Sequence, residues 1–474
     1  MDSFIPDIHR GPDHLAPIPG CTGDKFAYLI NTKNVFLVSD QFYHWLKDPG
    51  GKPNSDTATI DSDIKRLKAL GFWDHNPTFR EVSESYISIS LHLVHGCNLA
   101  CSYCNVQQGT YGDPFSFMDW TTAESAIDFL AQIRNGRTPR LIFYGGEPLL
   151  NWNILTRAAK KMVSIFSEPE MQLVTNGTLI DQEKAKFLSD YNIFTIISID
   201  GPKEVHDRNR PMLKARHSSY ERARYGLEHL KNAGAPFHIR ATWAPEHDSY
   251  DHILAHLIEM AGESRMVTIA IRFDQAGTAA MEKLNDILRD KYREAEENNS
   301  SLPSSTYQYL DQVLRADWAP VPRCEAGHAG FSINPRGDIY PCQVSVSMKR
   351  YRLGTVWDGI DLEGEDKISK FLEPSSPICN HCWARHLCSG PCRYSTPIPD
   401  NWPYCKMVKL QIMEALKFVV RTSDNNLMRI CNLPGFTENR LKALKRGVAL
   451  REILWKTNHH IKPISLCPQP VNHV

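Results

Sequence analysis

The sequence lacks an excess of either charge, a long apolar run and a secretory signal. Its 474 residues hold 54 Lys and Arg against 54 Asp and Glu, so no overall field attracts nucleic acid or an anionic membrane. No apolar stretch reaches the roughly 18 residues that a membrane-spanning helix needs. Residues 1–7 lack the basic and apolar regions of a signal peptide. We therefore expect a cytoplasmic protein that binds neither nucleic acid nor a membrane.

The thirteen cysteines do not fit a set of structural disulfides, because their number is odd and most of them cluster at short spacings. A reducing compartment suits thiolates that bind metal. Cys21, Cys431 and Cys467 lie outside every motif, and we expect free thiols there. Metal ligation is the expected role of most of the others. The length of the chain indicates two to four domains.

Cys97, Cys101 and Cys104 form a C-x3-C-x2-C loop with no fourth cysteine nearby. Thiolates are the usual ligands of iron-sulfur clusters, and four of them are normal. Three in one loop would leave one iron of a four-iron cluster without a protein ligand. The spacing alone also fits a zinc knuckle or three unrelated thiols.

Three polar motifs follow short apolar runs further along the chain. They are Tyr144-Gly145-Gly146-Glu147-Pro148, Thr175-Asn176-Gly177 and Ser198-Ile199-Asp200-Gly201. Paired glycines allow backbone to approach a ligand closely, and acidic and hydroxyl side chains can accept its hydrogen bonds. Tight turns and turn caps would leave the same patterns.

From Tyr86 onward, apolar strand-like runs alternate with longer amphipathic stretches, which is the βα pattern of a parallel sheet. Six repeats predict an α/β fold, a partial and open (β/α)6 barrel of the TIM type. The predicted strands are 87–94, 141–144, 172–175, 194–199, 237–242 and 267–273. Each polar motif then lies at the C-terminal end of a strand, where parallel α/β folds gather their active sites. We expect a capping box of Thr121 and Glu124 to begin one helix.

The N-terminal region has a different pattern. Residues 25–30 and 35–38 predict a β-hairpin, and helices are expected over 40–46 and 61–70. This pattern is similar to the small winged-helix domain that binds leader peptides, in which the peptide adds a strand to a sheet edge. A purely structural cap on the barrel is the alternative.

A second cysteine region begins after a polar linker near residue 300. Cys324, Gly337 and Cys342 fit C-x9-15-G-x4-C, and Cys379, Cys382, Cys388 and Cys392 fit C-x2-C-x5-C-x3-C, with Cys405 following. One or two structural zinc sites could also use these short pairs.

With these motifs the chain resembles the radical SAM superfamily, and its second cysteine region looks like the SPASM extension. The resemblance implies that Cys97, Cys101 and Cys104 hold a [4Fe-4S] cluster whose fourth iron binds S-adenosylmethionine. Two auxiliary [4Fe-4S] clusters are implied as well. Cys379, Cys382, Cys388 and Cys405 complete one of them; Cys324, Cys342 and Cys392 begin the other. The missing ligand of the latter is either absent, leaving an open iron, or supplied by a group such as His328.

The resemblance also implies a set of residues that bind the cofactor. Tyr103 occupies the aromatic position before the third cysteine and packs over the cluster. Gly145 and Gly146 admit the ligand, and Glu147 accepts a hydrogen bond from the methionyl ammonium group. The ribose hydroxyls are expected near Ser198, Asn176 and Asp200. No catalytic side chain beyond these is identified.

Four domains are predicted: a leader-peptide recognition domain (1–85), a radical SAM partial barrel (86–300), a SPASM domain (301–410) and a C-terminal helical extension (411–474). This layout implies an enzyme that modifies a ribosomal peptide or small protein subunit, reduced by a flavodoxin or ferredoxin. Thioether formation from cysteine to Asp or Glu is expected, since the layout is similar to the maturases of quinohemoprotein amine dehydrogenases. Formylglycine formation, carbon-carbon cross-linking and a non-enzymatic peptide-binding scaffold are the alternatives.

Overall fold

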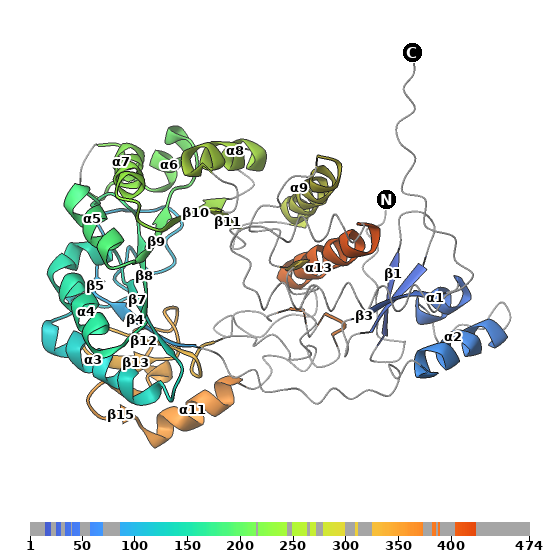
Figure 1. Ribbon diagram of the computed structural model, residues 1–474, viewed down its shortest axis with the longest axis horizontal. Coiled ribbons are helices and arrows are strands. Elements are labelled where there is room, and N and C mark those ends of the chain that lie inside the picture. The colour runs from blue at the N-terminus through green and yellow to red at the C-terminus, as the bar shows by residue number, and fades with distance from the viewer. Residues whose placement is uncertain are drawn as a thin grey trace, which may run out of the picture. The chain divides into compact units, whose positions relative to one another are not determined.

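The computed structural model describes residues 15–19, 25–29, 34–38, 40–47, 57–69, 86–214, 217–243, 249–262, 266–271, 278–298, 309–310, 325–372, 382–384, 387–388 and 403–422 (Figure 1). The chain divides into two compact units. The barrel unit comprises residues 83–276 and 324–373, and the sheet-helix unit comprises residues 1–82, 277–323 and 374–474.

A parallel sheet forms the centre of the barrel unit (Figure 1). Its six parallel strands are β4 (Tyr86–His92), β7 (Thr138–Tyr144), β8 (Glu170–Thr175), β9 (Phe194–Ser198), β10 (Phe237–Trp243) and β11 (Val267–Ile271). They lie in the order β11-β10-β9-β8-β7-β4. All six predicted strands are confirmed, with ends that differ by a few residues. The predicted partial barrel is therefore the observed fold.

Burial alternates along most strands of this sheet, whereas in β4 every residue after Tyr86 is buried. In β10, Phe237, Ile239, Ala241 and Trp243 are buried, whereas Arg240 between them is exposed. The ring of Trp243 lies 5.5 Å from that of Tyr250 in α8 (Tyr250–Ala261), so these buried residues lie on the face that contacts a helix. Each large apolar side chain buried in this way contributes roughly 1.5–3 kcal/mol. The other face of the strands is left for polar side chains.

The remaining helices of the barrel unit follow the strands in chain order. They are α3 (Trp120–Ile133), η1 (Pro148–Asn151), α4 (Trp152–Ile165), α5 (Gln182–Asp190), α6 (Lys203–Asn209) and α7 (Ser219–Asn232). The predicted capping box of α3 is wrong: Asp119 is the N-cap, and its Oδ1 accepts a hydrogen bond from the Thr122 N–H at 2.8 Å. A carboxylate one position before the helix satisfies that amide better than a hydroxyl already inside the first turn.

The sheet continues beyond β4 with strands from far along the chain. Strand β12 (Gly330–Ile333) pairs in parallel with β4, and β13 (Asp338–Tyr340), β14 (Gly354–Thr355) and β15 (Gly359–Ile360) extend it antiparallel. The 3-10 helix η3 (Lys349–Tyr351) and helix α11 (Leu362–Leu372) belong to the same segment. The first part of the predicted SPASM region therefore completes the sheet of the barrel unit.

The sheet-helix unit begins with an antiparallel sheet in the order β1-β2-β3. Its elements are β1 (Leu15–Pro19), β2 (Lys25–Leu29), β3 (Asn34–Val38), α1 (Asp40–Lys47), α2 (Thr57–Ala69), α9 (Thr278–Glu297) and α13 (Pro403–Arg421). The predicted hairpin and the two helices after it are confirmed, and β1 is an additional strand. Residues 423–474 of the predicted C-terminal helical extension lie outside the described residues.

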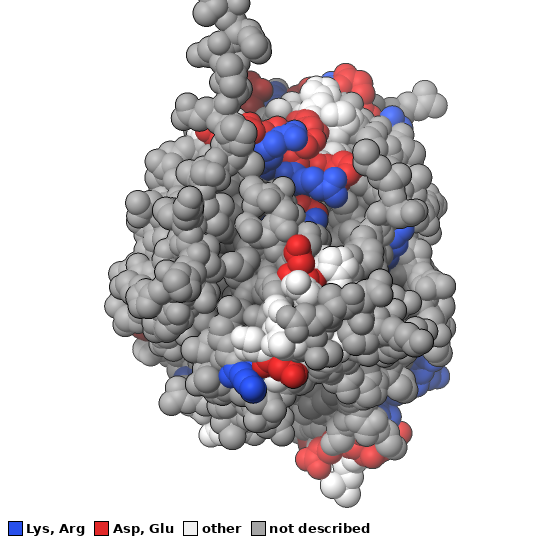
Figure 2. Space-filling model, turned by 90° about the vertical axis from the view of Figure 1, so that its right-hand side faces the viewer, with Lys and Arg blue, Asp and Glu red and all other residues white. Residues whose placement is uncertain are grey.

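Charges of both signs are interspersed in this unit. Helix α9 carries ion pairs one turn apart, between Arg289 and Asp286 at 3.0 Å and between Arg293 and Asp290 at 2.7 Å. Lys and Arg side chains also lie next to Asp and Glu side chains on the face that Figure 2 shows. Among the described helices, none combines the length and the apolar character needed to cross a membrane.

Candidate cluster and cofactor site

The cysteine triad lies in a loop between the short strands β5 (Val94–His95) and β6 (Ser116–Phe117) of the barrel unit. All three thiols are partly buried. Two of them accept backbone hydrogen bonds: Leu99 N–H donates to Cys97 Sγ at 3.4 Å, and Gln108 N–H donates to Cys104 Sγ at 3.2 Å. Amide donors aimed at cysteine sulfurs are one of the means by which proteins tune iron-sulfur clusters. The donor set of the loop therefore fits such a cluster.

The buried surroundings of the triad raise the pKa values of two of its thiols. Burial, with the nearby carboxylate of Glu147, raises the pKa of Cys97 to about 12. Burial also raises the pKa of Cys101. Protons on these thiols would therefore be released when a metal binds. No three His, Cys, Asp or Glu side chains converge on a single-ion site within the part of the chain that the structure describes.

The Gly145-Gly146 turn after β7 packs directly on the start of the cysteine loop. Gly146 N–H donates to the Val94 carbonyl and Glu147 N–H donates to the Gly96 carbonyl, both at 3.0 Å. A Cβ on Gly146 would lie 2.0 Å from the Gly96 carbonyl oxygen. Gly145 has φ of +132°, which side-chain-bearing residues rarely adopt. Both glycines are therefore required by the approach of two backbone segments.

Glu147 is fully buried, and its carboxylate joins three elements of the site. Oε1 accepts hydrogen bonds from Leu149 N–H at 3.1 Å and from the Thr175 hydroxyl at 2.7 Å, while Oε2 accepts from Asn176 N–H at 2.8 Å. Burial raises the pKa of Glu147 to about 7 although the three hydrogen bonds oppose the rise. The carboxylate thus ties the end of β7 to the end of β8.

Asn176 lies beside the triad, as expected of a residue near the cofactor. Its Nδ2 donates to Asn98 Oδ1 at 2.8 Å and lies 3.7 Å from Cys97 Sγ. Its Oδ1 accepts hydrogen bonds from Thr178 N–H at 3.0 Å and the Thr178 hydroxyl at 2.7 Å. The motif after β8 therefore contacts the cysteine loop through side chains.

Asp200 is also fully buried, and protein groups hold both of its carboxylate oxygens. Oδ1 accepts a hydrogen bond from Thr242 N–H at 2.9 Å. Oδ2 accepts one from the Tyr103 hydroxyl and lies 3.0 Å from Arg210 Nε. The structure therefore brings Tyr103 and Asp200 together as direct partners. Ser198 ends β9 and lies beside Arg240 of β10 in the sheet register.

Sequence reasoning missed Arg210 and His206 as members of this site. Asp200 N–H donates to His206 Nδ1 at 3.3 Å, and the Arg210 guanidinium lies over the Tyr103 ring at 5.3 Å. The sequence pattern that could have indicated them is His206-Asp207-Arg208-Asn209-Arg210, in which a histidine and an arginine lie one helical turn apart shortly after Asp200. Local periodicity could not show that they point back to the carboxylate.

The second cysteine region is divided between the two units. Cys342 follows β13 in the barrel unit, where its N–H donates to the Ser345 hydroxyl at 3.3 Å. Cys382, Cys388 and Cys405 are partly buried residues of the sheet-helix unit. Cys324, Cys379 and Cys392 lie outside the described residues. His328 lies in the turn before β12. The two auxiliary ligand sets therefore stay predictions.

Residues 91–257 match the family model of the Radical SAM superfamily. The chain is 34% identical over 151 residues to an uncharacterized protein of Methanocaldococcus jannaschii, covering 31% of this chain and half of that protein. It is 24% identical over 426 residues to the radical SAM cyclopropyl synthase of Paramaledivibacter caminithermalis, covering 83% of this chain and 85% of that enzyme. A cysteine-type anaerobic sulfatase-maturating enzyme of Clostridium perfringens is 24% identical over 342 residues, with coverages of 63% and 86%.

The fold is similar to solved structures as well. Native anSMEcpe with bound AdoMet matches with a TM-score of 0.60 and 21% identity, covering 70% of this chain and 98% of that one. The form described with AdoMet and the Cp18Cys peptide matches with a TM-score of 0.59, 21% identity and the same coverages. A similarity between two structures at 21% sequence identity shows a shared fold and nothing more. Residues 91–257, which carry the cysteine triad and all three strand-end motifs, are similar to the Radical SAM superfamily by their match to its family model.

Proposed function

We propose that this radical SAM enzyme modifies a peptide or small protein made on the ribosome. The observation that carries the proposal is that Glu147, Asn176 and Asp200, at the ends of β7, β8 and β9, each hydrogen-bond to the loop of the cysteine triad. A relative that matures sulfatases and a similar structure that contains a peptide support a peptide substrate. We also propose a cytoplasmic location and reduction by a flavodoxin or ferredoxin.

The residues of the site fit a cluster and S-adenosylmethionine. When bound to Cys97, Cys101 and Cys104, a [4Fe-4S] cluster with this cofactor supplies a 5′-deoxyadenosyl radical that removes a hydrogen atom from the substrate. The Gly145-Gly146 turn packs its backbone on the loop that carries the triad, and the carboxylate of Glu147 ties this turn to the end of β8. Asn176 holds its amide nitrogen beside Cys97, and Ser198 lies at the end of β9.

The finer proposal is a sulfur-to-carbon thioether, as in the maturases of quinohemoprotein amine dehydrogenases. One hydrogen atom leaves the substrate carbon as deoxyadenosine forms. The cysteine thiol then loses its proton, a carbon-sulfur bond forms, and one electron passes to an acceptor. An auxiliary cluster on the second cysteine region is the proposed acceptor. The substrate therefore loses two hydrogens for each link.

A second candidate is formylglycine formation, which the relationship to the Clostridium perfringens enzyme supports. Carbon-carbon bond formation is a third candidate, supported by the cyclopropyl synthase. Anaerobic incubation with the peptide encoded beside this gene, followed by mass spectrometry, distinguishes these reactions. Loss of two hydrogens per link supports a cross-link, and fragmentation separates thioethers from carbon-carbon bonds. Replacement of sulfur by oxygen at one cysteine supports formylglycine formation instead.

A variant in which Cys97, Cys101 and Cys104 are all replaced by alanine tests the first step. We expect it to release no deoxyadenosine while the auxiliary cysteines still bind iron. Unchanged cleavage of S-adenosylmethionine in this variant would refute the assignment.

We further propose that the β1-β2-β3 sheet with α1 and α2 is a winged-helix-like domain that binds a leader segment. The strand order leaves β1 and β3 at its edges, and a peptide strand adds to such an edge. Deletion of residues 1–85 should weaken peptide binding more than cleavage of S-adenosylmethionine without peptide. Equal peptide affinity in the full and shortened chains, at equal iron content, would remove this part of the proposal.

A further inference from the structure

The segment after α6 pairs with the cysteine loop as a short antiparallel strand. Ser102 N–H donates to the Asn209 carbonyl at 2.9 Å, and Ala100 N–H donates to the Pro211 carbonyl at 2.8 Å. Leu213 N–H donates to the Asn98 carbonyl at 2.9 Å. The bonded positions alternate along both segments, as in a β-ladder. Residues 98–102 of the loop, which include Cys101, are therefore held by residues 209–213.

Arg210 lies in the middle of this segment, and its side chain is 11% exposed. Its Nε lies 3.0 Å from Asp200 Oδ2, and its guanidinium lies over the ring of Tyr103. Tyr103 is itself between Cys101 and Cys104 in the loop. A buried positive charge is thus held beside the cysteine ligands.

The orientation of the Asp200 and Arg210 pair is fixed from several sides. Thr242 N–H occupies Oδ1 of the carboxylate, and His206 Nδ1 accepts the Asp200 N–H. Only Oδ2 faces Arg210 and Tyr103. Buried charges that are fixed in this way act through a low local dielectric, so their effect on a neighbouring charged group is strong.

We infer that Arg210 is a positioning residue that holds the triad loop and whose positive charge raises the reduction potential of the cluster on that loop. The inference rests on the proposed cluster. Reduction adds one negative charge to the cluster, and a nearby cation stabilises that charge. Asp200 acts in the opposite sense, because its negative charge disfavours the added electron.

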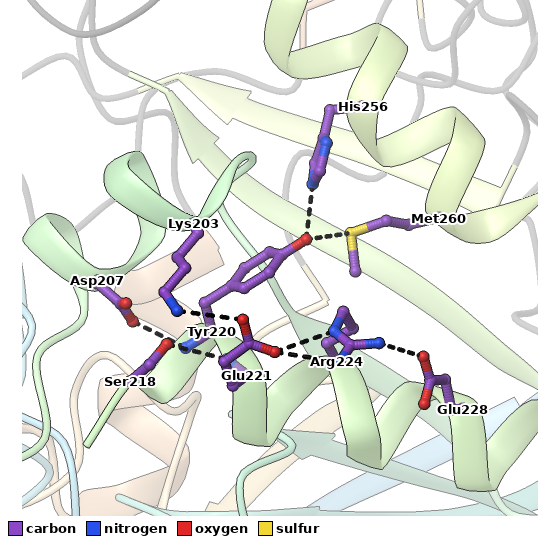
Figure 3. A network of polar contacts seen from close by, with 9 residues as sticks. All are labelled: Lys203, Asp207, Ser218, Tyr220, Glu221, Arg224, Glu228, His256 and Met260. Atoms are coloured by element: carbon purple, nitrogen blue, oxygen red, sulfur yellow. Dashed lines mark hydrogen bonds and ion pairs between the residues drawn. The ribbon is translucent and has the colours of Figure 1, made fainter.

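Three substitutions test the charge effect: Arg210→Gln, Arg210→Lys and Asp200→Asn. Arg224→Gln is the control, because Arg224 also pairs with carboxylates, those of Glu221 and Glu228, but lies on helix α7 away from the cysteine loop (Figure 3). The protein is reconstituted anaerobically, its iron content is measured, and its midpoint potential is followed by electron paramagnetic resonance. The signal that changes when S-adenosylmethionine is added identifies the triad cluster among any auxiliary clusters.

We expect Arg210→Gln to shift the midpoint potential downward and Asp200→Asn to shift it upward, with Arg210→Lys close to the unchanged protein. Arg224→Gln should shift it in neither direction. A structural role alone would not shift the midpoint potential in opposite directions in Arg210→Gln and Asp200→Asn. If Arg210→Gln fails to bind iron, the upward shift of Asp200→Asn and the recovery in Arg210→Lys still decide the question.

Equal potentials in all variants at full iron content would overturn the inference, as would a shift in the same direction for Arg210→Gln and Asp200→Asn. Those results would leave the proposed function intact. An unchanged protein that binds no iron at the triad would instead refute the proposed function itself. The two failures are therefore distinguishable in one set of measurements.

Discussion

Tyr103 donates a hydrogen bond from its hydroxyl to the carboxylate of Asp200, which lies 97 residues further along the chain. Tyr103 belongs to the cysteine loop after β5, and Asp200 follows β9. The contact joins the loop that holds the triad to a strand on the other side of β7 and β8. Burial and the Asp200 carboxylate raise the pKa of Tyr103, while Arg210 opposes the rise, so the hydroxyl keeps its proton as a donor.

Tyr103→Phe should lower the free energy of unfolding by about 2 kcal/mol, since a hydrogen bond to a buried carboxylate is lost while the ring is kept. Chemical denaturation of the metal-free chain measures this change. Tyr225→Phe is the matched control, because an arginine also lies over the Tyr225 ring, at 4.7 Å, but the side chain is 54% exposed. A loss as large in Tyr225→Phe as in Tyr103→Phe would show that the contact with Asp200 is not the cause.

Gly146→Ala should prevent the turn after β7 from packing on the cysteine loop. The added Cβ would lie 2.0 Å from the oxygen and 2.4 Å from the carbonyl carbon of Gly96, and both are backbone atoms that a side-chain rotation cannot move. We expect a loss of about 2 to 3 kcal/mol in unfolding free energy and a lower iron content after reconstitution.

Gly136→Ala is the control for this steric effect. Gly136 has φ of +78°, but no atom lies within 4 Å of the position of its added Cβ. Its replacement should cost only about 1 kcal/mol of backbone strain and leave the iron content unchanged. Equal iron contents in the two variants would contradict the role given to Gly146.

Much of the fold follows from local patterns in the sequence. Six apolar runs separated by amphipathic stretches were sufficient to predict β4 and the strands from β7 to β11, because each run is buried beneath helices formed by its neighbours in the chain. The pairing of β12 with β4 was not predictable, since Gly330 meets Ser88 in the register across more than two hundred residues. Local periodicity has no information about such pairings.

The motifs predict Glu147, Asn176 and Asp200 as residues that bind the cofactor, because parallel α/β folds gather their active sites at the C-terminal ends of strands. That role stays a prediction. Their protein partners were not expected: both oxygens of Glu147 and of Asp200 already accept hydrogen bonds or ion pairs within the chain. Arg210 was missed because the turn of α6 brings it back to Asp200, and the spacing of the two residues in the sequence does not predict that contact.

Glu147→Gln should destabilise the site although it changes the side chain very little in shape. All three partners of the carboxylate, at Leu149, Thr175 and Asn176, are donors. A glutamine has one acceptor oxygen only, so its NH2 group would face a donor. We expect a loss of about 2 kcal/mol in unfolding free energy, measured by chemical denaturation. A variant as stable as the unchanged chain would show that these bonds contribute little.

His206 should make the stability of the barrel unit depend on pH. Burial lowers its pKa to about 4, with Arg210 adding to the effect and Asp200 opposing it. The unfolded chain binds a proton at about pH 6.5, whereas the folded chain binds it only near the lower value. This group therefore leaves the free energy of unfolding constant above pH 6.5 and reduces it as the pH falls from 6.5 to 4. The full reduction is on the order of 3 kcal/mol.

His206→Asn separates this contribution from those of the other titrating groups. Asparagine can place an acceptor oxygen where His206 Nδ1 accepts the Asp200 N–H, and it does not titrate. Denaturation of both proteins at about pH 7.5 and about pH 5 should show a loss of unfolding free energy that is smaller in the variant by about 2 kcal/mol, because the unfolded chain takes up one proton fewer. The same loss in both proteins would mean that His206 is already protonated in the folded chain at the lower pH. The ring would then have to donate where it now accepts, and Asp200 would lose the bond that fixes its backbone.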